Sequence, residues 1–212
     1  MNPLRIVVVD DHELVRTGLQ QTLNRQEGLR VVAACGNGAQ ALRTLQSRGC
    51  DVLLLDLALP DMSGLDVLRQ LGVADPHLPV LVLSAYPETQ FGVQVLRAGA
   101  SGFIGKEADA AELVRAIRTV ARGNRYVGQG LTDALVNGLS GPVSAPLHEQ
   151  LSVREFQVLC KLAAGSGVTE IGAELNLSPK TISTYRSRVL SKLGLDSTAE
   201  LISYALRHQL LP

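Results

Sequence analysis

The chain has no tryptophan, only three phenylalanines and few cysteines among its 212 residues. Its three cysteines, Cys35, Cys50 and Cys160, are odd in number and lack nearby histidine pairs, which favours reduced, buried thiols over disulfides or a zinc site. No apolar run reaches the length of about 18 residues that indicates a membrane-spanning helix. The N-terminus enters a strand-like run directly instead of a charged leader, so we expect a cytoplasmic protein with no membrane partner.

An excess of charge of one sign is also missing, because 20 lysines and arginines balance 20 aspartates and glutamates. Bulk charge therefore predicts no polyanionic partner, and any nucleic-acid site must be a local concentration of basic residues. Apolar residues make up 46% of the chain, which is enough for hydrophobic cores and excludes the disordered class. The length allows one large domain or two small ones.

Short apolar runs alternate with amphipathic stretches over residues 4–120. The runs are rich in valine, isoleucine and leucine, as buried parallel strands are, and they are Leu4–Val9, Leu29–Cys35, Val52–Leu55, Pro79–Ser84 and Gly102–Ile104. Helical spacing of apolar residues follows each run, at 12–25, 38–47, 64–71, 88–98 and 109–121. The repeats predict an α/β domain over 1–121, with a doubly wound five-stranded parallel sheet and helices on both faces.

The sequence changes character after residue 121. Glycines and prolines crowd into 122–148, which predicts a linker with at most one short helix around Thr132–Leu139. From Leu151 onward only helical signals remain, which predicts an all-α domain of four helices over 149–212. The signals are a capping box at Ser152–Glu155, a second helix at 169–175, a Ser178-Pro179 start before a helix at 179–193, and a last helix at 198–208.

Polar residues follow four of the five predicted strands, at the ends where doubly wound sheets bind ligands. They are Asp10 and Asp11 after the first strand, Asp56 after the third, Ser84 after the fourth and Lys106 after the fifth. Each alone has a simpler explanation, such as a helix cap, but their joint placement favours a site. Converging carboxylates favour a hard cation such as Mg²⁺, and beside a lysine one of them can accept a phosphoryl group.

A glycine pattern offers a different interpretation. Gly36-Asn-Gly38-Ala-Gln-Ala41 follows a strand and opens a helix, as a dinucleotide-binding turn does, and Asp56 lies 20 residues further on. That motif belongs after the first strand of its unit, whereas this one follows the second. A tight turn with close helix packing is therefore favoured over a nucleotide cofactor.

The helix expected at 179–193 has two different faces. Ile182, Tyr185, Val189 and Leu193 share the face that should pack inward. The opposite face carries short hydroxyls and cations, and no acid occurs between 178 and 192. After a short helix and a tight turn, this arrangement is typical of a DNA recognition helix. The alternative is an ordinary solvated helix face.

The N-terminal motifs resemble the receiver domain of two-component response regulators over 4–120. The motifs are Asp10-Asp11, Asp56-Leu-Ala-Leu-Pro60, Ser84-Ala85 and Gly99-Ala-Ser-Gly-Phe103-Ile-Gly-Lys106. The resemblance implies that Asp56 is the phosphoacceptor. It further implies an Mg²⁺ site formed by Asp10, Asp11, Asp56 and the Ala58 backbone carbonyl. Lys106 would pair with the phosphoryl group, and Ser84 would swing towards that group. Phe103 would be an aromatic switch residue.

The C-terminal motifs resemble the LuxR-type helix-turn-helix of NarL/FixJ response regulators over 149–212. They include Leu151-Ser-Val-Arg-Glu155, Leu175-Asn-Leu-Ser178-Pro-Lys-Thr181-Ile182 and Lys192-Leu-Gly194. The resemblance implies base contacts from Ser183, Thr184 and Ser187, and phosphate contacts from Lys180, Thr181, Tyr185, Arg188 and Lys192. It also implies that the last helix pairs with its copy in a dimer.

Together these observations predict a non-enzymatic transcriptional regulator. A sensor histidine kinase would load Asp56 in the presence of Mg²⁺, and the chain would then dimerise on promoter DNA. Three alternatives stay open: a Rossmann-like enzyme that uses the glycine turn, a receiver whose helical tail binds a protein, and DNA binding that is independent of phosphorylation.

Overall fold

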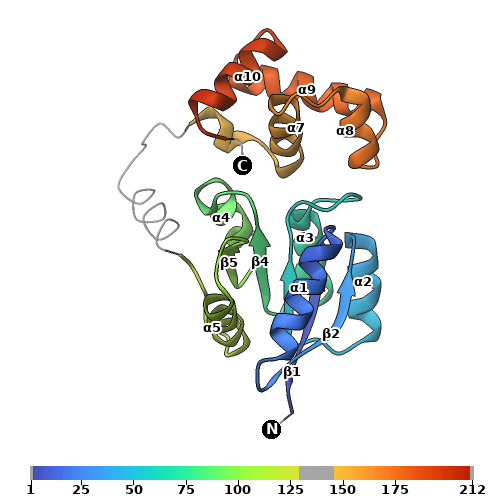
Figure 1. Ribbon diagram of the computed structural model, residues 1–212, viewed down its shortest axis with the longest axis vertical. Helices are drawn as coiled ribbons and strands as arrows, with labels where there is room; N and C mark the ends of the chain where they lie inside the picture. Colours follow the sequence, from blue (N-terminus) through green and yellow to red (C-terminus); the bar gives the residue numbers. More distant parts are fainter. Residues whose placement is uncertain (1, 129–145, 211–212) are drawn as a thin grey trace. The chain divides into compact units, whose positions relative to one another are not determined.

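The computed structural model describes residues 2–128 and 146–210, which fall into two compact units (Figure 1). Each unit is described by itself. The short helix expected around Thr132–Leu139 lies outside the described residues. Among the helices of those two ranges, none has both the length and the hydrophobicity needed to cross a bilayer.

The first unit is built on a five-stranded parallel sheet with the order β2-β1-β3-β4-β5, so the predicted doubly wound sheet is confirmed. The strands are β1 (Leu4–Val9), β2 (Leu29–Cys35), β3 (Val52–Leu55), β4 (Val80–Ser84) and β5 (Gly102–Gly105). Each agrees with its predicted bounds to within one residue. Pro79, which has no N–H, precedes β4 instead of opening it, and its carbonyl still accepts a bond from Leu53 N at 2.9 Å.

Helices follow each strand and cover both faces of the sheet. They are α1 (Glu13–Asn24), α2 (Gly38–Ser47), α3 (Gly64–Ala74), α4 (Glu88–Arg97) and α5 (Ala110–Ala121). α1 and α5 share one core cluster with the face that carries Ile6, Val8 and Leu54. Residues of the opposite face such as Val7 and Leu53 are fully buried, so the remaining helices cover them.

Local sequence explains where these helices begin and end. Side chains of Asn37, Ser63 and Asp109 cap α2, α3 and α5 by accepting a bond from a backbone N–H three residues on. α3 continues three residues beyond the predicted 64–71. It stops at Asp75 because the following Pro76 disfavours helical dihedral angles there, and Asp75 adopts φ −148° and ψ 79°.

The first residues after α5 remain attached to the sheet, although the sequence predicts a linker from 122. Tyr126 forms a parallel bridge with Gly102 of β5, and its carbonyl accepts a bond from Phe103 N at 3.2 Å. The Tyr126 hydroxyl donates to Glu112 of α5 at 2.8 Å. This short segment therefore extends the edge of the sheet beyond β5.

The second unit is all helical, as predicted. It contains a short 3₁₀ helix η1 (Leu147–Gln150), which the sequence analysis did not predict, and the helices α7 (Val153–Ala163), α8 (Val168–Glu174), α9 (Pro179–Leu193) and α10 (Thr198–Arg207). The capping box of Ser152 and Glu155 is present at the start of α7. α9 begins after the Ser178 cap and ends at Gly194, whose φ of 65° is the left-handed conformation of a glycine C-cap. Phe156, Ile171 and Ile182 are among the residues that form its core.

Gly64 lets α3 approach β3 closely, which gives a testable consequence for stability. A Cβ atom at position 64 would overlap the backbone carbonyl oxygen of Asp56, whereas one at Gly72 of the same helix would meet nothing within 4 Å. We expect Gly64→Ala to destabilise the first unit by about 1–3 kcal/mol, because overpacking against backbone cannot relax cheaply. Gly72→Ala should stabilise it by up to about 1 kcal/mol through helix propensity. Thermal unfolding followed by circular dichroism checks both, and equal Tm values for the two variants would contradict this account.

Candidate functional site: an acidic crevice and a basic helix

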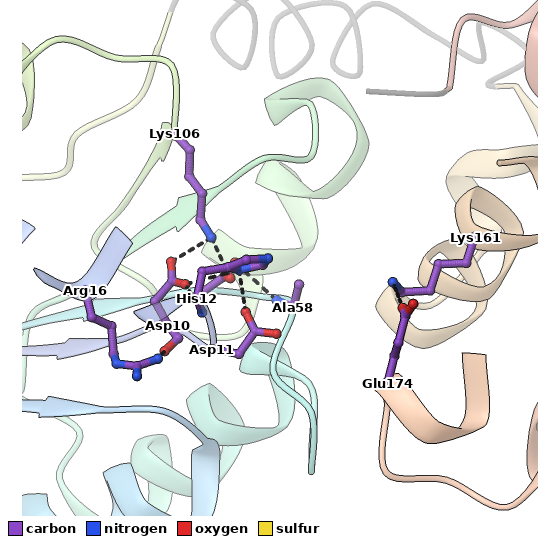
Figure 2. A network of polar contacts seen from close by, with 9 residues as sticks. Asp10, Asp11, His12, Arg16, Ala58, Lys106, Lys161 and Glu174 are labelled. Atoms are coloured by element: carbon purple, nitrogen blue, oxygen red, sulfur yellow. Dashed lines mark hydrogen bonds and ion pairs between the residues drawn. The ribbon is translucent and has the colours of Figure 1, made fainter. Parts of the chain in front are cut away.

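A lysine bridges two buried carboxylates at the carboxyl end of the sheet (Figure 2). Lys106 Nζ lies 2.6 Å from Asp10 Oδ2 and 2.7 Å from Asp56 Oδ2. The side chains of Asp10 and Asp56 are each only 1% exposed. The structure therefore brings these three predicted residues together in one crevice.

Backbone hydrogen bonds that continue the sheet beyond its strands hold the crevice in shape. Asp56 N donates to Val9 O at 2.9 Å, and Lys106 N donates to Ser84 O at 2.9 Å. Arg16 fixes the backbone of the first acid, because its Nη1 donates to Asp10 O at 2.7 Å. The acids are thus placed by the register of the parallel strands.

Asp11 and His12 form the more exposed side of the crevice. His12 Nδ1 lies 2.7 Å from Asp11 Oδ1 and 3.4 Å from Asp10 Oδ1. One ligand atom from each of Asp10, Asp11, His12 and Asp56 can be chosen so that all four lie within 4.8 Å of one another. The sequence indicates only that His12 begins a helix, although its position directly after two acids is a signal for a place in the crevice.

The electrostatics of the crevice follow from burial and from the shared lysine. Desolvation raises the pKa of Asp56, and the nearby charge of Asp10 acts in the same direction, against the attraction of Lys106. Desolvation works to lower the pKa of Lys106, but charge and hydrogen bonding from the two carboxylates outweigh it and raise that pKa. The lysine therefore stays charged, and it offsets one of the three carboxylate charges in the crevice.

The donor set of the crevice is compatible with a metal ion. Three aspartates supply oxygen atoms, which are the ligands that Mg²⁺ prefers, and one lysine leaves the group with excess negative charge. Ala58 also borders this group, because its N–H donates to Asp56 Oδ1 at 3.2 Å. A divalent cation would relieve the remaining repulsion between the carboxylates.

The two predicted switch residues lie on neighbouring strands. Ser84 ends β4 and is 1% exposed, and its Oγ accepts a hydrogen bond from Tyr86 N at 3.0 Å. Phe103 lies on β5 and is also 1% exposed. A shift of either side chain therefore requires repacking of buried contacts.

The glycine turn before α2 is occupied by an acid of the chain itself. Gly38 N and Ala39 N donate to the carboxylate of Asp61 at 2.9 and 2.8 Å. In a dinucleotide-binding unit, these backbone groups at the helix N-terminus would bind a pyrophosphate. The structure therefore disfavours the enzyme alternative.

In the second unit, α9 presents the polar face that its sequence predicts. Ile182, Val189 and Leu193 are buried, whereas Tyr185 is only half-buried. The Arg188 guanidinium lies over the Tyr185 ring, 5.9 Å from its centroid. A shallow groove of about 370 Å³ runs along the start of this helix and is lined by Ser178, Lys180, Thr181, Thr184, Tyr185 and Arg188.

The three short hydroxyls on α9 are arranged alike. Ser183, Thr184 and Ser187 are exposed, and each donates its hydroxyl hydrogen to the carbonyl four residues earlier, at 2.9 to 3.0 Å. Their oxygen atoms are therefore directed as acceptors towards solvent. Such oxygens suit donor groups on a partner.

Lys192 differs from the other basic residues of α9. Its Nζ lies 2.6 Å from Glu155 Oε2 and donates to Gln150 O at 3.1 Å. The Glu155 side chain is only 5% exposed and also completes the capping box of α7. Lys192 thus joins α9 to α7, whereas Lys180 and Arg188 line the groove.

Comparison with known proteins defines the class of this chain. Residues 6–118 match the family described as the response regulator receiver domain, and residues 149–205 match the bacterial regulatory proteins of the luxR family. The chain belongs to the response regulators that combine a receiver domain with a LuxR-type DNA-binding domain.

Individual relatives support this assignment over almost the whole chain. The response regulator UvrY of Escherichia coli K12 is 34% identical, and the match covers 98% of this chain and 95% of UvrY. The oxygen regulatory protein NreC of Staphylococcus aureus is 38% identical over 98% of this chain and 99% of its own length. Among solved structures, that of the RcsB response regulator of Salmonella typhimurium matches with a TM-score of 0.69 and 26% identity, covering 96% of this chain and 97% of that one.

The buried Glu155 carboxylate should make the second unit pH-dependent. Desolvation acts to raise its pKa, but hydrogen bonds from Lys192 and Ser152 outweigh it and hold the pKa below 4.5. Because the pKa is depressed on folding, the carboxylate stabilises the fold above pH 4.5 and loses that contribution as the pH falls through the folded value. We expect Glu155→Gln to cost about 1–3 kcal/mol at pH 7 and progressively less below pH 4.5.

Thermal unfolding of the full chain at several pH values measures this effect. Glu149→Gln is the matched control, because desolvation raises the pKa of Glu149 and the sign of its pH dependence is opposite. A deficit of Glu155→Gln that stays constant between pH 7 and pH 3 would show that the ion pair does not contribute as described.

Proposed function

We propose that this chain is a phosphorylation-switched regulator of transcription that accepts a phosphoryl group on Asp56. The observation that carries the proposal is the bridge of Lys106 between the buried Asp10 and Asp56, in a chain that also has a LuxR-type domain. A buried carboxylate beside a lysine and further acids is arranged for phosphoryl transfer. The proposed role is regulatory and not enzymatic.

The loading step transfers a phosphoryl group from a phosphohistidine of a sensor kinase. A bond forms between an Asp56 carboxylate oxygen and phosphorus while the histidine nitrogen–phosphorus bond breaks, and the nitrogen leaves with its electron pair. Asp10, Asp11, Asp56 and the Ala58 carbonyl would hold Mg²⁺, which neutralises charge on the phosphoryl oxygens when it is bound. Lys106 is already 2.7 Å from Asp56 and pairs with the new phosphoryl oxygens.

Phosphorylation replaces the single negative charge of the Asp56 carboxylate with the roughly two charges of an acyl phosphate, and it changes the partners of the polar residues in the crevice. The Lys106 ammonium group moves away from Asp10 and towards the phosphoryl group. Ser84 Oγ donates a hydrogen bond to that group, which moves the start of the loop that carries Tyr86. Phe103 repacks beside it, and this two-state rearrangement is the proposed switch.

The output is binding to promoter DNA by α9. Ser183, Thr184 and Ser187 contact base edges, and the phosphate contacts come from Lys180, Thr181, Tyr185 and Arg188. Lys192, which the sequence also assigned to phosphate, instead pairs with the buried Glu155 and holds α9 against α7. The groove along the start of α9, which several of these residues line, supports the assignment. Short hydroxyl readers make little direct contact, so the sequence-dependent shape of the DNA contributes to recognition.

Dimerisation through α10 completes the proposal. The proposed contact is the face of α10 that carries Leu206, which is 61% exposed, whereas Leu201, Tyr204 and Ala205 of the same helix are buried. A related structure shows RcsB of Salmonella enterica bound to the promoter rprA with a phosphomimetic, at 25% identity and a TM-score of 0.65. Because the partners are promoter DNA and a kinase, we place the protein in the cytoplasm. The protein-binding tail is the less favoured alternative, since it leaves the basic groove unexplained.

The phosphoacceptor assignment is tested by Asp56→Asn. We expect incubation with acetyl phosphate and Mg²⁺ to add one phosphoryl group to the wild-type chain and none to the variant, as read by intact mass. Asp51→Asn is the matched control, because Asp51 is a hydrogen-bonded acid that pairs with Arg5 and lies outside the crevice. A phosphorylated Asp56→Asn chain would refute the assignment.

The DNA face is tested by the salt dependence of binding. Lys180→Ala and Arg188→Ala should each weaken binding on every DNA sequence and reduce the slope of log affinity against log salt by about one. Lys161→Ala removes a lysine that pairs with Glu174 and serves as the control. Unchanged slopes for Lys180→Ala and Arg188→Ala would favour the protein-binding tail.

A further inference from the structure

Asp61, in the loop between β3 and α3, is hydrogen-bonded to the N-terminus of α2. Its Oδ1 accepts from Gly38 N at 2.9 Å and from Met62 N at 2.9 Å, and its Oδ2 accepts from Ala39 N at 2.8 Å. Both carboxylate oxygens are therefore used in joining two segments that lie more than 20 residues apart. The glycine turn, whose sequence resembles a nucleotide-binding motif, therefore binds this carboxylate of the chain itself.

The same loop carries Ala58 and returns to the crevice. Its start is fixed by the bond from Ala58 N to Asp56 Oδ1 at 3.2 Å, and its end by the bond from Gly64 N to Leu57 O at 3.0 Å. Between these two points, the Asp61 carboxylate accepts hydrogen bonds from Gly38 N and Ala39 N of α2. Its loss would remove the three hydrogen bonds from Gly38 N, Ala39 N and Met62 N that the carboxylate accepts.

Packing around Gly38 shows how closely α2 approaches the loop. A Cβ atom at this position would lie 2.5 Å from Met62 Cγ and 2.9 Å from Val67 Cγ2. A larger residue at 38 would therefore have to displace Met62 or Val67. The hydrogen bonds of Asp61 and the contacts of Met62 fix the loop from the same side.

We propose that Asp61 is a positioning residue that sets the affinity of the crevice for Mg²⁺, by clamping to α2 the loop that carries Ala58. The inference rests on the proposed function, since it concerns the metal that assists loading of Asp56. Partners of a metal-binding segment that lie outside the ligand set orient the ligands, and their loss commonly weakens metal affinity. An anionic carboxylate is suited to this place because a helix N-terminus presents free N–H groups and partial positive charge.

The ionisation of Asp61 agrees with this role. Desolvation acts to raise its pKa, but the bonds from Ala39 N, Gly38 N and Met62 N outweigh it and lower the pKa. Asparagine at this position has only one acceptor oxygen, and its amide nitrogen would face a backbone donor. Asp61→Asn therefore breaks the clamp without a change in side-chain size.

The experiment is titration of the full chain with Mg²⁺ by isothermal calorimetry. We expect Asp61→Asn to raise the Kd for Mg²⁺ about tenfold. In acetyl phosphate assays, the Mg²⁺ concentration for half-maximal phosphorylation should rise by the same factor, while the maximal rate at saturating Mg²⁺ stays unchanged. Asp51→Asn, which removes an acid paired with Arg5, should change neither quantity.

A second variant reaches the same loop from the side of α2. Gly38→Ala improves helix propensity but pushes Met62 away, so it should also weaken Mg²⁺ binding. Gly72→Ala is its control, because a methyl group there meets no other atom within 4 Å. Circular dichroism of each variant before titration shows that the measured chains are folded.

Each result bears on the inference. If the wild-type chain binds Mg²⁺ and the Asp61→Asn and Gly38→Ala chains bind it with the same Kd, the positioning role is overturned and the proposed function stays intact. A lower maximal rate with an unchanged Mg²⁺ requirement would also overturn it. A wild-type chain that binds no Mg²⁺ would overturn both the inference and the metal site of the proposed function.

Discussion

The receiver unit depends on the burial of two like charges with one shared counter-charge. Asp10 and Asp56 are almost inaccessible to water, and Lys106 contacts both within 2.7 Å. Such an arrangement costs desolvation energy, and one cation cannot neutralise three acids. The crevice therefore keeps uncompensated negative charge, and binding of a further cation or a change of charge at Asp56 changes that balance. Strand register, the bond from Arg16 and the loop after β3 all serve to keep this unfavourable group in place.

The sequence was sufficient to predict most of the fold and the composition of the crevice. Parallel strands that are buried on both faces appear as apolar runs, and their carboxyl ends must share one edge of the sheet, so the meeting of Asp10, Asp56 and Lys106 follows from spacing alone. The cap at Ser178 and the left-handed Gly194 likewise follow from local rules. These features depend on contacts between neighbours in the chain or on strand order.

Contacts between distant segments could not be predicted in this way. Nothing in the local sequence pairs Lys192 with Glu155 or Asp61 with the start of α2, because those contacts depend on how loops and helices approach one another. The amphipathic pattern of α9 placed Tyr185 in the core, but the ring is only half-buried and lies beneath Arg188. A glycine pattern is also ambiguous by itself, since the same backbone N–H groups can donate to a cofactor phosphate or to a carboxylate of the chain.

The attachment of Tyr126 to the sheet has a mechanical consequence. The backbone of Tyr126 exchanges hydrogen bonds with Ser101 and Phe103, so the exit of the chain from the receiver shares the strand that leads to Lys106. The N–H of Gly128, two residues later, also donates to Glu88 of α4 at 2.8 Å. A rearrangement that moves β5 and α4 relative to each other would therefore change the hydrogen bonds that hold the first residues after α5.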